Sequence, residues 1–187
     1  MTLYEFKKKY LSLIEELNPN NENLTDDPDL AAKQNETVNQ VMFEMARYKK
    51  IPKYVEFPVK NGDLITFDVL EQKSGYAVYQ VALMGGVKNS PKADGTVFKI
   101  LEDGTAEVNL YVYPERITEK TKDKAYEFEL SPDALEVMVY GVAADLLKSD
   151  ASSEYGAIYA QRYETMLQRL DSRYQTAGIT IEGGVNV

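Results

Sequence analysis

The chain has 187 residues, 44% of them hydrophobic, and a formal net charge of -9, so it is long enough to bury a substantial core in one medium domain or two small ones. This acidic balance argues against a nucleic-acid-binding surface, because such surfaces cluster Lys and Arg to neutralise phosphates. The absence of Cys and His excludes disulfides, thiolate chemistry and most zinc and haem sites, and it removes the most common general base near pH 7.

The first 50 residues have the periodicity of two amphipathic helices. Apolar residues recur every three or four positions from Thr2 to Leu17, and Thr2 is a suitable N-cap. After a polar break, Asp27 and Pro28 show the cap-then-proline pattern of a helix start, and a second apolar stripe runs to Lys50. We therefore expect an N-terminal helical hairpin.

From Ile51 the hydrophobic period changes to two, and β-branched and aromatic residues replace helix formers. Asn-Gly, Ser-Gly and Asp-Gly pairs supply turns, and the longer segment Met84 to Gly95 is predicted to be a mobile surface loop. The pattern predicts a small antiparallel sandwich or barrel of about six strands. The predicted strands are YVEFPV, LITFDVL, YAVYQVAL, TVFKIL, AEVNLYVY and AYEFEL.

Helical periodicity returns after Leu130. Ser131 and Pro132 can start a helix whose apolar face extends to Leu147, and a short polar break leads to a second stripe that ends at Tyr174. These two helices are predicted to form an antiparallel hairpin that needs cover from the N-terminal pair. The predicted fold is α+β, with a four-helix bundle split in sequence (residues 1–50 and 131–174), an inserted antiparallel β-domain (residues 51–130) and an extended C-terminal arm (residues 175–187).

The sequence offers few candidates for catalysis. Asp26, Asp27 and Asp29 are explained by helix capping, and no phosphate-binding loop, dinucleotide fingerprint or nucleophile elbow occurs. A glycosidase that uses only carboxylates is an alternative, but such enzymes usually stack sugars on Trp, and the chain has none. We predict that the protein is not an enzyme and has no cofactor or metal site.

Nothing in the sequence indicates a membrane or secretory segment. The N-terminus lacks the basic-then-apolar layout of a signal peptide, and no apolar run approaches membrane-spanning length. We expect an intracellular, reducing compartment, or a particle assembled there.

Aromatic residues offer a clearer indication of function than the carboxylates. The chain contains 14 Tyr, 6 Phe and no Trp, and several Tyr and Arg lie on the C-terminal hairpin. Core packing is the expected role of most of the tyrosines, and interface contact is the alternative for the rest. The candidate interface residues on this hairpin and the arm are Tyr155, Tyr159, Arg162, Tyr163, Arg169, Arg173, Tyr174, Ile179, Ile181 and Val185.

Two segments carry a resemblance to a known family. They are TDDPDLAAKQNETVNQVMFEMARYKKIPKY and ELSPDALEVMVYGVAADLLKSDASSEYGAIYAQRYETMLQRLDSR. The first has an acidic N-cap and a central Asn39, and the second has a Tyr-x-x-Ala-Ala pattern from Tyr140 to Ala144. With the order of helices and strands, they resemble the head-tail connector proteins (adaptor, tail-hub or neck proteins) of tailed bacteriophages.

The resemblance implies a structural role in the neck region of a virion, for a protein made in the cytoplasm of the bacterial host. Its partners would be further copies of itself in a ring, the portal protein and neck or tail proteins, with no specific nucleic acid and no membrane. A ring subunit needs two different, complementary flanks. The arm is expected either to add a strand to a partner's sheet edge or to be a flexible terminus.

An alternative function is a ligand-binding module. In this hypothesis the β-domain recognises a saccharide or a peptide, and the helical bundle is a stalk. The tyrosines that would carry the binding are Tyr76, Tyr79, Tyr111 and Tyr113.

Overall fold

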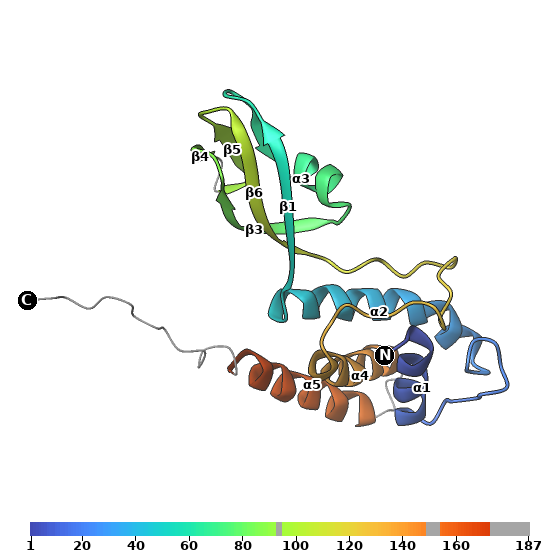
Figure 1. Ribbon diagram of the computed structural model, residues 1–187. Coiled ribbons are helices and arrows are strands. Elements are labelled where there is room, and N and C mark those ends of the chain that lie inside the picture. The colour runs from blue at the N-terminus through green and yellow to red at the C-terminus, as the bar shows by residue number, and fades with distance from the viewer. Residues whose placement is uncertain (93–94, 149–153, 173–187) are drawn as a thin grey trace, which may run out of the picture.

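The computed structural model describes residues 1–92, 95–148 and 154–172 (Figure 1). The helices are α1 (Leu3–Leu13), α2 (Pro28–Tyr48), α3 (Phe67–Ser74), α4 (Pro132–Leu147) and α5 (Glu154–Ser172). The strands are β1 (Ile51–Val59), β2 (Leu64–Thr66), β3 (Val78–Gly85), β4 (Asn89–Lys92), β5 (Val97–Ile100) and β6 (Gly104–Val112). The strands form a separate layer above the C-terminal end of α2 (Figure 1).

The first helix starts at the predicted cap but ends earlier than predicted. The Glu5 amide donates to the Thr2 hydroxyl at 3.2 Å, and the Thr2 amide donates to the Glu5 carboxylate at 2.9 Å, which is a capping box. The helix ends at Leu13 and not at Leu17. The cause is Glu15, whose φ of 63° lies in the left-handed region and cannot continue a helix.

The starts of α2 and α4 are also those that the sequence predicts. The Asp27 carboxylate accepts hydrogen bonds from the amides of Asp29 and Leu30, and Pro28 is the first residue of α2. Pro132 likewise opens α4, although the hydroxyl of Ser131 accepts no bond from the first turn. The start of α4 is therefore determined more by Pro132 than by Ser131.

The predicted four-helix bundle is wrong. The helix α4 lies at the centre of the helical part and packs against α1, α2 and α5, and it buries ten of its sixteen residues. The short α1 lies across the end of α2 and does not run beside it (Figure 1). A helix that is apolar on most sides must pack against several neighbours. The bundle prediction was wrong because it took α4 to have only one apolar face.

The helices α4 and α5 do form an antiparallel hairpin, and α5 is its outer member. Gly156 near the start of α5 faces Leu147 at the end of α4, while Gly141 further back on α4 faces the ring of Tyr163. The connection between them, residues 149–153, lies outside the described residues. On α5 the buried side chains include Leu167 and Leu170 near its C-terminal end, so much of this helix is open on its outer side.

The strands form two three-stranded antiparallel sheets. Their orders are β1-β6-β3 and β2-β5-β4. Alternate residues of each central strand are buried, such as Val108 and Leu110 of β6 and Phe98 and Ile100 of β5, as expected for sheets with one covered face. The buried residues of both sheets belong to one hydrophobic core.

Three of the predicted β segments differ from the prediction. Only the first three residues of LITFDVL form a strand, since the Thr66 hydroxyl caps α3 and Gly75, at φ 75°, ends it. The segment AYEFEL is not a strand and contributes one isolated bridge, between Glu127 and Thr2. The predicted loop from Met84 to Gly95 contains the edge strand β4.

The chain returns from β6 to α4 through a long crossover, residues 113–131, that runs along α2 (Figure 1). Asn39 of α2 is buried and holds it: its side-chain amide donates to the Ile117 carbonyl at 2.8 Å, and its oxygen accepts from the Ile117 amide at 2.8 Å. Further along, the α1 amides of Leu3 and Tyr4 donate to the carbonyls of Tyr126 and Asp123, each at 3.0 Å. The crossover is therefore fixed to both N-terminal helices.

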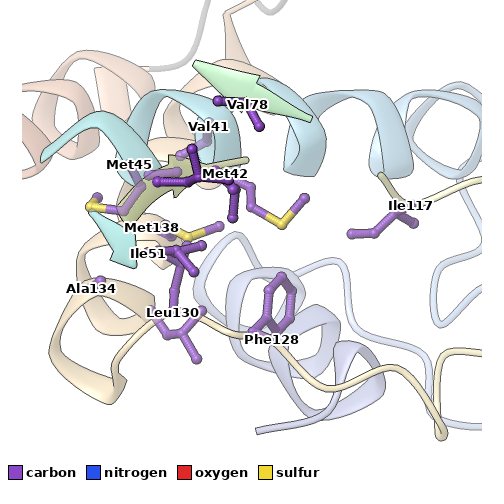
Figure 2. Close-up of a cluster of buried hydrophobic side chains, with 14 of the residues drawn as sticks. Val41, Met42, Met45, Ile51, Val78, Ile117, Phe128, Leu130, Ala134 and Met138 are labelled. Carbon is purple, nitrogen blue, oxygen red and sulfur yellow. The ribbon is translucent and has the colours of Figure 1, made fainter. Parts of the chain in front are cut away.

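Figure 2 shows the core where these parts meet. The side chains of Met42, Met45 and Met138 lie between the two layers, with Ile51 of β1 and Val78 of β3 beside them (Figure 2). Methionine adapts its shape to irregular gaps, which suits a junction of helices with strands.

The predicted domain boundaries stay a prediction, and the predicted arm lies outside the described residues.

We expect Gly141→Ala to lower the free energy of unfolding by about 1–3 kcal/mol, as overpacked core substitutions do, although alanine favours helices. A Cβ at this position would lie 2.9 Å from both the Tyr163 ring and the Val41 side chain. Urea denaturation followed by circular dichroism measures the change.

Gly156→Ala is the matched control, because its Cβ would meet its nearest neighbour, Leu147, at 3.4 Å, an ordinary contact distance. This variant should be as stable as the parent protein or up to about 1 kcal/mol more stable. Equal stability of the two variants would contradict the close packing described at Gly141.

Candidate functional site

Half of the predicted interface residues lie in the described part of the chain, all on α5. Tyr155 is 65% exposed, Arg162 and Arg169 are exposed, and Tyr159 and Tyr163 are half-buried. Ile158, which the sequence analysis did not select, is 54% exposed on the same helix. The other predicted residues, Arg173, Tyr174, Ile179, Ile181 and Val185, lie outside the described residues.

Three of these side chains, Tyr155, Tyr159 and Arg162, form a cluster with Tyr140 of α4, which we call the tyrosine cluster. The ring of Tyr159 lies 6.3 Å from that of Tyr155 and 6.2 Å from that of Tyr140. The Arg162 guanidinium lies 4.5 Å from the centre of the Tyr140 ring, a cation–π distance. The cluster keeps Arg162 in place at the surface while Tyr155 stays accessible.

Tyr159 also ties the cluster to α1. Its hydroxyl donates to the carbonyl of Leu13 at 2.9 Å, and that carbonyl belongs to the last turn of α1, where helix carbonyls lack intrahelical partners. Two hollows adjoin the cluster: one of about 730 Å³ between α1 and α4, whose lining includes Tyr140, and one of about 200 Å³ bounded by Leu13 and Leu147. The tyrosine cluster with these hollows is the first candidate interaction site.

Tyr163 makes internal contacts, and its predicted interface role stays a prediction. Its hydroxyl donates to the Glu44 carboxylate of α2 at 3.0 Å, and its ring covers Gly141. Burial, and then the adjacent Glu44 charge, raise the pKa of Tyr163 well above its usual range. This hydroxyl stays protonated and fastens α5 to α2.

A second candidate site lies where the helices meet the strands. This junction cleft has a volume of about 870 Å³. In one wall two adjacent aromatic rings lie between two cations: the Phe43 and Tyr113 rings lie 5.4 Å apart, Arg116 lies 5.9 Å from the Phe43 ring and Arg47 lies 5.7 Å from the Tyr113 ring. The cleft is lined by Phe43, Arg47, Gly75, Tyr76, Ala77, Tyr113, Pro114, Glu115, Arg116 and Glu129.

The four tyrosines of the ligand-binding alternative lie at or beside this cleft. Tyr79 lies 4.8 Å from Tyr113 and 6.5 Å from Tyr111, measured between ring centres. Tyr76 lines the cleft, and the Lys53 ammonium lies 4.2 Å from its ring centre. The sequence separated these residues by as many as 37 positions (113 minus 76), and the pairing of β3 with β6 brings them together.

The junction also stabilises the fold through hydrogen bonds between the strand layer and α2. The Tyr79 hydroxyl donates to the Ala46 carbonyl in the last turn of α2 at 2.8 Å, so it satisfies a carbonyl that the helix leaves without an intrahelical partner. Arg47 donates to the Tyr113 hydroxyl from two nitrogens, at 2.9 Å and 2.7 Å. These bonds fix the strand layer to the end of α2.

Chemically, the junction cleft combines aromatic faces with both signs of charge. Arg116 pairs with Glu36 at 2.6 Å, and Lys53 pairs with Glu129 at 2.8 Å. Such a surface suits a peptide or a sugar, which stack on aromatic rings and accept or donate hydrogen bonds. The sequence analysis missed Phe43 and Arg47, since nothing in the helical periodicity of α2 marks them, and it missed Arg116, which lies in the irregular crossover.

Among the described residues, no group of three or more carboxylates is placed to hold a metal ion. No helix within residues 1–92, 95–148 and 154–172 is long and apolar enough to cross a membrane.

Comparisons with known proteins gave no assignment. No family model matches the sequence, and the search of curated proteins found no match. The two candidate sites are therefore argued from their geometry alone.

Replacing Tyr79 with phenylalanine should lower the free energy of unfolding by about 1 kcal/mol, the usual net contribution of one such hydrogen bond, because the Ala46 carbonyl loses its donor. Burial and the neighbouring Tyr113 and Tyr111 raise the pKa of Tyr79 to about 12. The folded state thus favours the neutral hydroxyl, and its contribution is complete below about pH 10 and lost as pH rises towards 12.

Urea denaturation at neutral pH and an absorbance titration of the tyrosines test this prediction, and the variant should lose one late-titrating group. Tyr155→Phe is the control, as this ring is largely exposed, and its stability should stay within about 0.5 kcal/mol of the parent. If both variants were equally stable, the Tyr79 bond would contribute nothing.

Proposed function

We propose that this protein is a non-enzymatic head-tail connector subunit of a tailed bacteriophage. It assembles with further copies into a ring in the virion neck, between the portal and the neck or tail proteins. It is made in the cytoplasm of the bacterial host, and it needs no cofactor, membrane or specific nucleic acid for this role.

The observation that carries the proposal is that large apolar side chains are exposed in two separate places. Tyr155 and Ile158 of α5 are 65% and 54% exposed, and a further set is exposed on the strand layer. Contiguous apolar patches on a soluble chain mark surfaces that bind other proteins. A connector subunit has to hold its neighbours and different partners above and below, so it needs several such surfaces. The exposed set on the strand layer comprises Tyr54, Leu64, Leu83 and Leu101.

The segments that carry the resemblance also have defined roles in the fold. Asp27 caps α2, Asn39 holds the crossover through two hydrogen bonds, and Tyr140 belongs to the tyrosine cluster. These residues position the helices whose outer faces a partner would meet. Their structural roles are consistent with the proposed function, which does not depend on a four-helix bundle.

Coexpression with a portal protein from the same phage genome tests the proposal. We expect the two proteins to copurify, and we expect Ile158→Asp to weaken the complex roughly tenfold, because it places a charge in an apolar contact. Gln168→Asp is the matched control, since Gln168 is exposed on the same helix and carries no apolar surface. Failure to bind the portal, together with normal head-tail joining in phage that lack the chain, would rule the proposal out.

One observation favours the second candidate, a ligand-binding module, namely the gathering of Tyr76, Tyr79, Tyr111 and Tyr113 at the junction cleft. Under this hypothesis, saturable binding to a saccharide or peptide panel should fall at least tenfold in Tyr76→Ala, the tyrosine that lines the cleft without capping a helix. Tyr155→Ala serves as control and should bind normally. A panel without any saturable ligand would dismiss this candidate.

A further inference from the structure

The strand layer has two outer faces of opposite charge. The acidic face is the outer side of the β1-β6-β3 sheet, and it consists of Tyr54, Glu56, Leu83 and Glu107. The basic face is the outer side of the β2-β5-β4 sheet, and it consists of Leu64, Lys92, Lys99 and Leu101. Each face has two exposed large apolar side chains and two charges of one sign.

Strand register places the members of the acidic face next to one another. Tyr54 of β1 and Leu83 of β3 both pair with Asn109 of β6, and Glu56 pairs with Glu107 in the next row on the same side. Tyr54 and Leu83 are 53% and 62% exposed. The apolar pair and the carboxylate pair therefore form one continuous patch across three strands.

The carboxylates of this patch have no cationic partner among the described residues. Like charges directly opposite each other across two strands are destabilising, and Glu56 faces Glu107 in this way. The Tyr54 hydroxyl donates to Glu56 at 3.2 Å, but among the described residues no Lys or Arg pairs with either carboxylate. A partner with lysines would relieve this repulsion.

The basic face has the complementary layout. Lys99 of β5 pairs with Leu64 on one side and with Ser90 on the other, and Leu101 lies two residues beyond Lys99 on the same side of the sheet. Leu64 and Leu101 are exposed. Lys88 nearby is paired with Glu102, whereas Lys92 and Lys99 have no ion pair among the described residues.

The two faces point away from the shared core in different directions, since the opposite side of each sheet is buried in it. The sheet edges are poorer docking sites than the faces. Pro52 and Pro58 remove amides from β1, β3 has two register shifts, β2 has three residues, and β4 contains Pro91. Interrupted edges discourage strand addition, so contact through the faces is favoured.

We propose that the acidic face of one copy of this chain binds the basic face of the next copy. The occupant of each face is thus a second copy, identified by opposite charge and by the matching pair of apolar side chains on each face. Because the two surfaces differ, the contact is heterologous and repeats from copy to copy until it closes into a ring. The closed ring rests on the proposed function, whereas the contact itself does not.

Cysteine crosslinking tests the contact directly, because the chain has no Cys of its own. Leu83→Cys marks the acidic face and Leu64→Cys marks the basic face, both at exposed positions. On mild oxidation, the double variant should form a ladder of dimers, trimers and larger species. An equimolar mixture of the two single variants should form dimers at least tenfold faster than either variant alone.

A control pair, Leu83→Cys with Ala32→Cys, sets the rate of random collision, as Ala32 is exposed but lies on α2, outside both faces and both candidate sites. The proposal is overturned if the face pair crosslinks no faster than this control pair. It is also overturned if each single variant crosslinks as fast as the mixture, since the contact would then be isologous.

Charge reversal gives a second test in the same crosslinking assay. Glu107→Lys alone and Lys99→Glu alone should each slow crosslinking roughly tenfold, because like charges then meet. The variant with both reversals, and an equimolar mixture of the two single reversals, should regain the parent rate. Crosslinking that is insensitive to reversal, or that is not restored in the double variant, would refute the assignment.

These results are separable from those on the portal. A face-to-face contact without portal binding would keep this inference and remove the connector function. Portal binding with rings that tolerate Glu107→Lys would do the opposite.

Discussion

The structure depends on the burial of α4. Its sequence is apolar on most sides, and ten of its sixteen residues are buried, so no single neighbour could cover it. The helices α1, α2 and α5 each cover one side. The positions of these three helices follow from this requirement, including the exposure of α5, which lies outermost and presents the tyrosine cluster, whereas α3 packs against β1, β2 and β3.

Polar contacts then fix the strand layer to this helical part. The end of α2 is capped by the Tyr79 hydroxyl, Arg47 is held by the hydroxyl of Tyr113, and the crossover is held by Asn39. Buried hydrogen bonds of this kind contribute modest net stability, but they are costly to leave unmade. They therefore specify one orientation of the strands on the helices, which apolar contact alone would leave less defined.

Local chemistry made much of the fold predictable from the sequence. The helix starts at Thr2, Asp27 and Pro132 depend on residues within a few positions, and the alternation of β1 and β6 is equally local. The bundle was not predictable, because periodicity does not tell how many sides of a helix are covered. The short helix after Thr66 was missed since two of its first residues, Phe67 and Val69, are also good strand formers.

The candidate sites were less predictable than the fold. Tyr159 and Tyr163 were selected for their spacing on α5, but their hydrogen-bond partners, Leu13 and Glu44, lie 146 and 119 residues away. The pairing of Arg47 with Tyr113 spans 66 residues. Such contacts form only when the crossover and the α4–α5 hairpin pack against the N-terminal helices, so no local sequence pattern predicts them.

The central position of α4 has a consequence for synthesis on the ribosome. The N-terminal helices leave the exit tunnel first, but the helix that covers them spans Pro132–Leu147. Their apolar surfaces therefore stay exposed to solvent while the strand layer is being synthesised. The strand layer pairs β1 with β6 and β2 with β5, and since all of these strands precede α4 in the chain, the layer can form before α4 emerges. Completion of α4 is then the step that removes the exposed surface to which chaperones bind and from which aggregation begins.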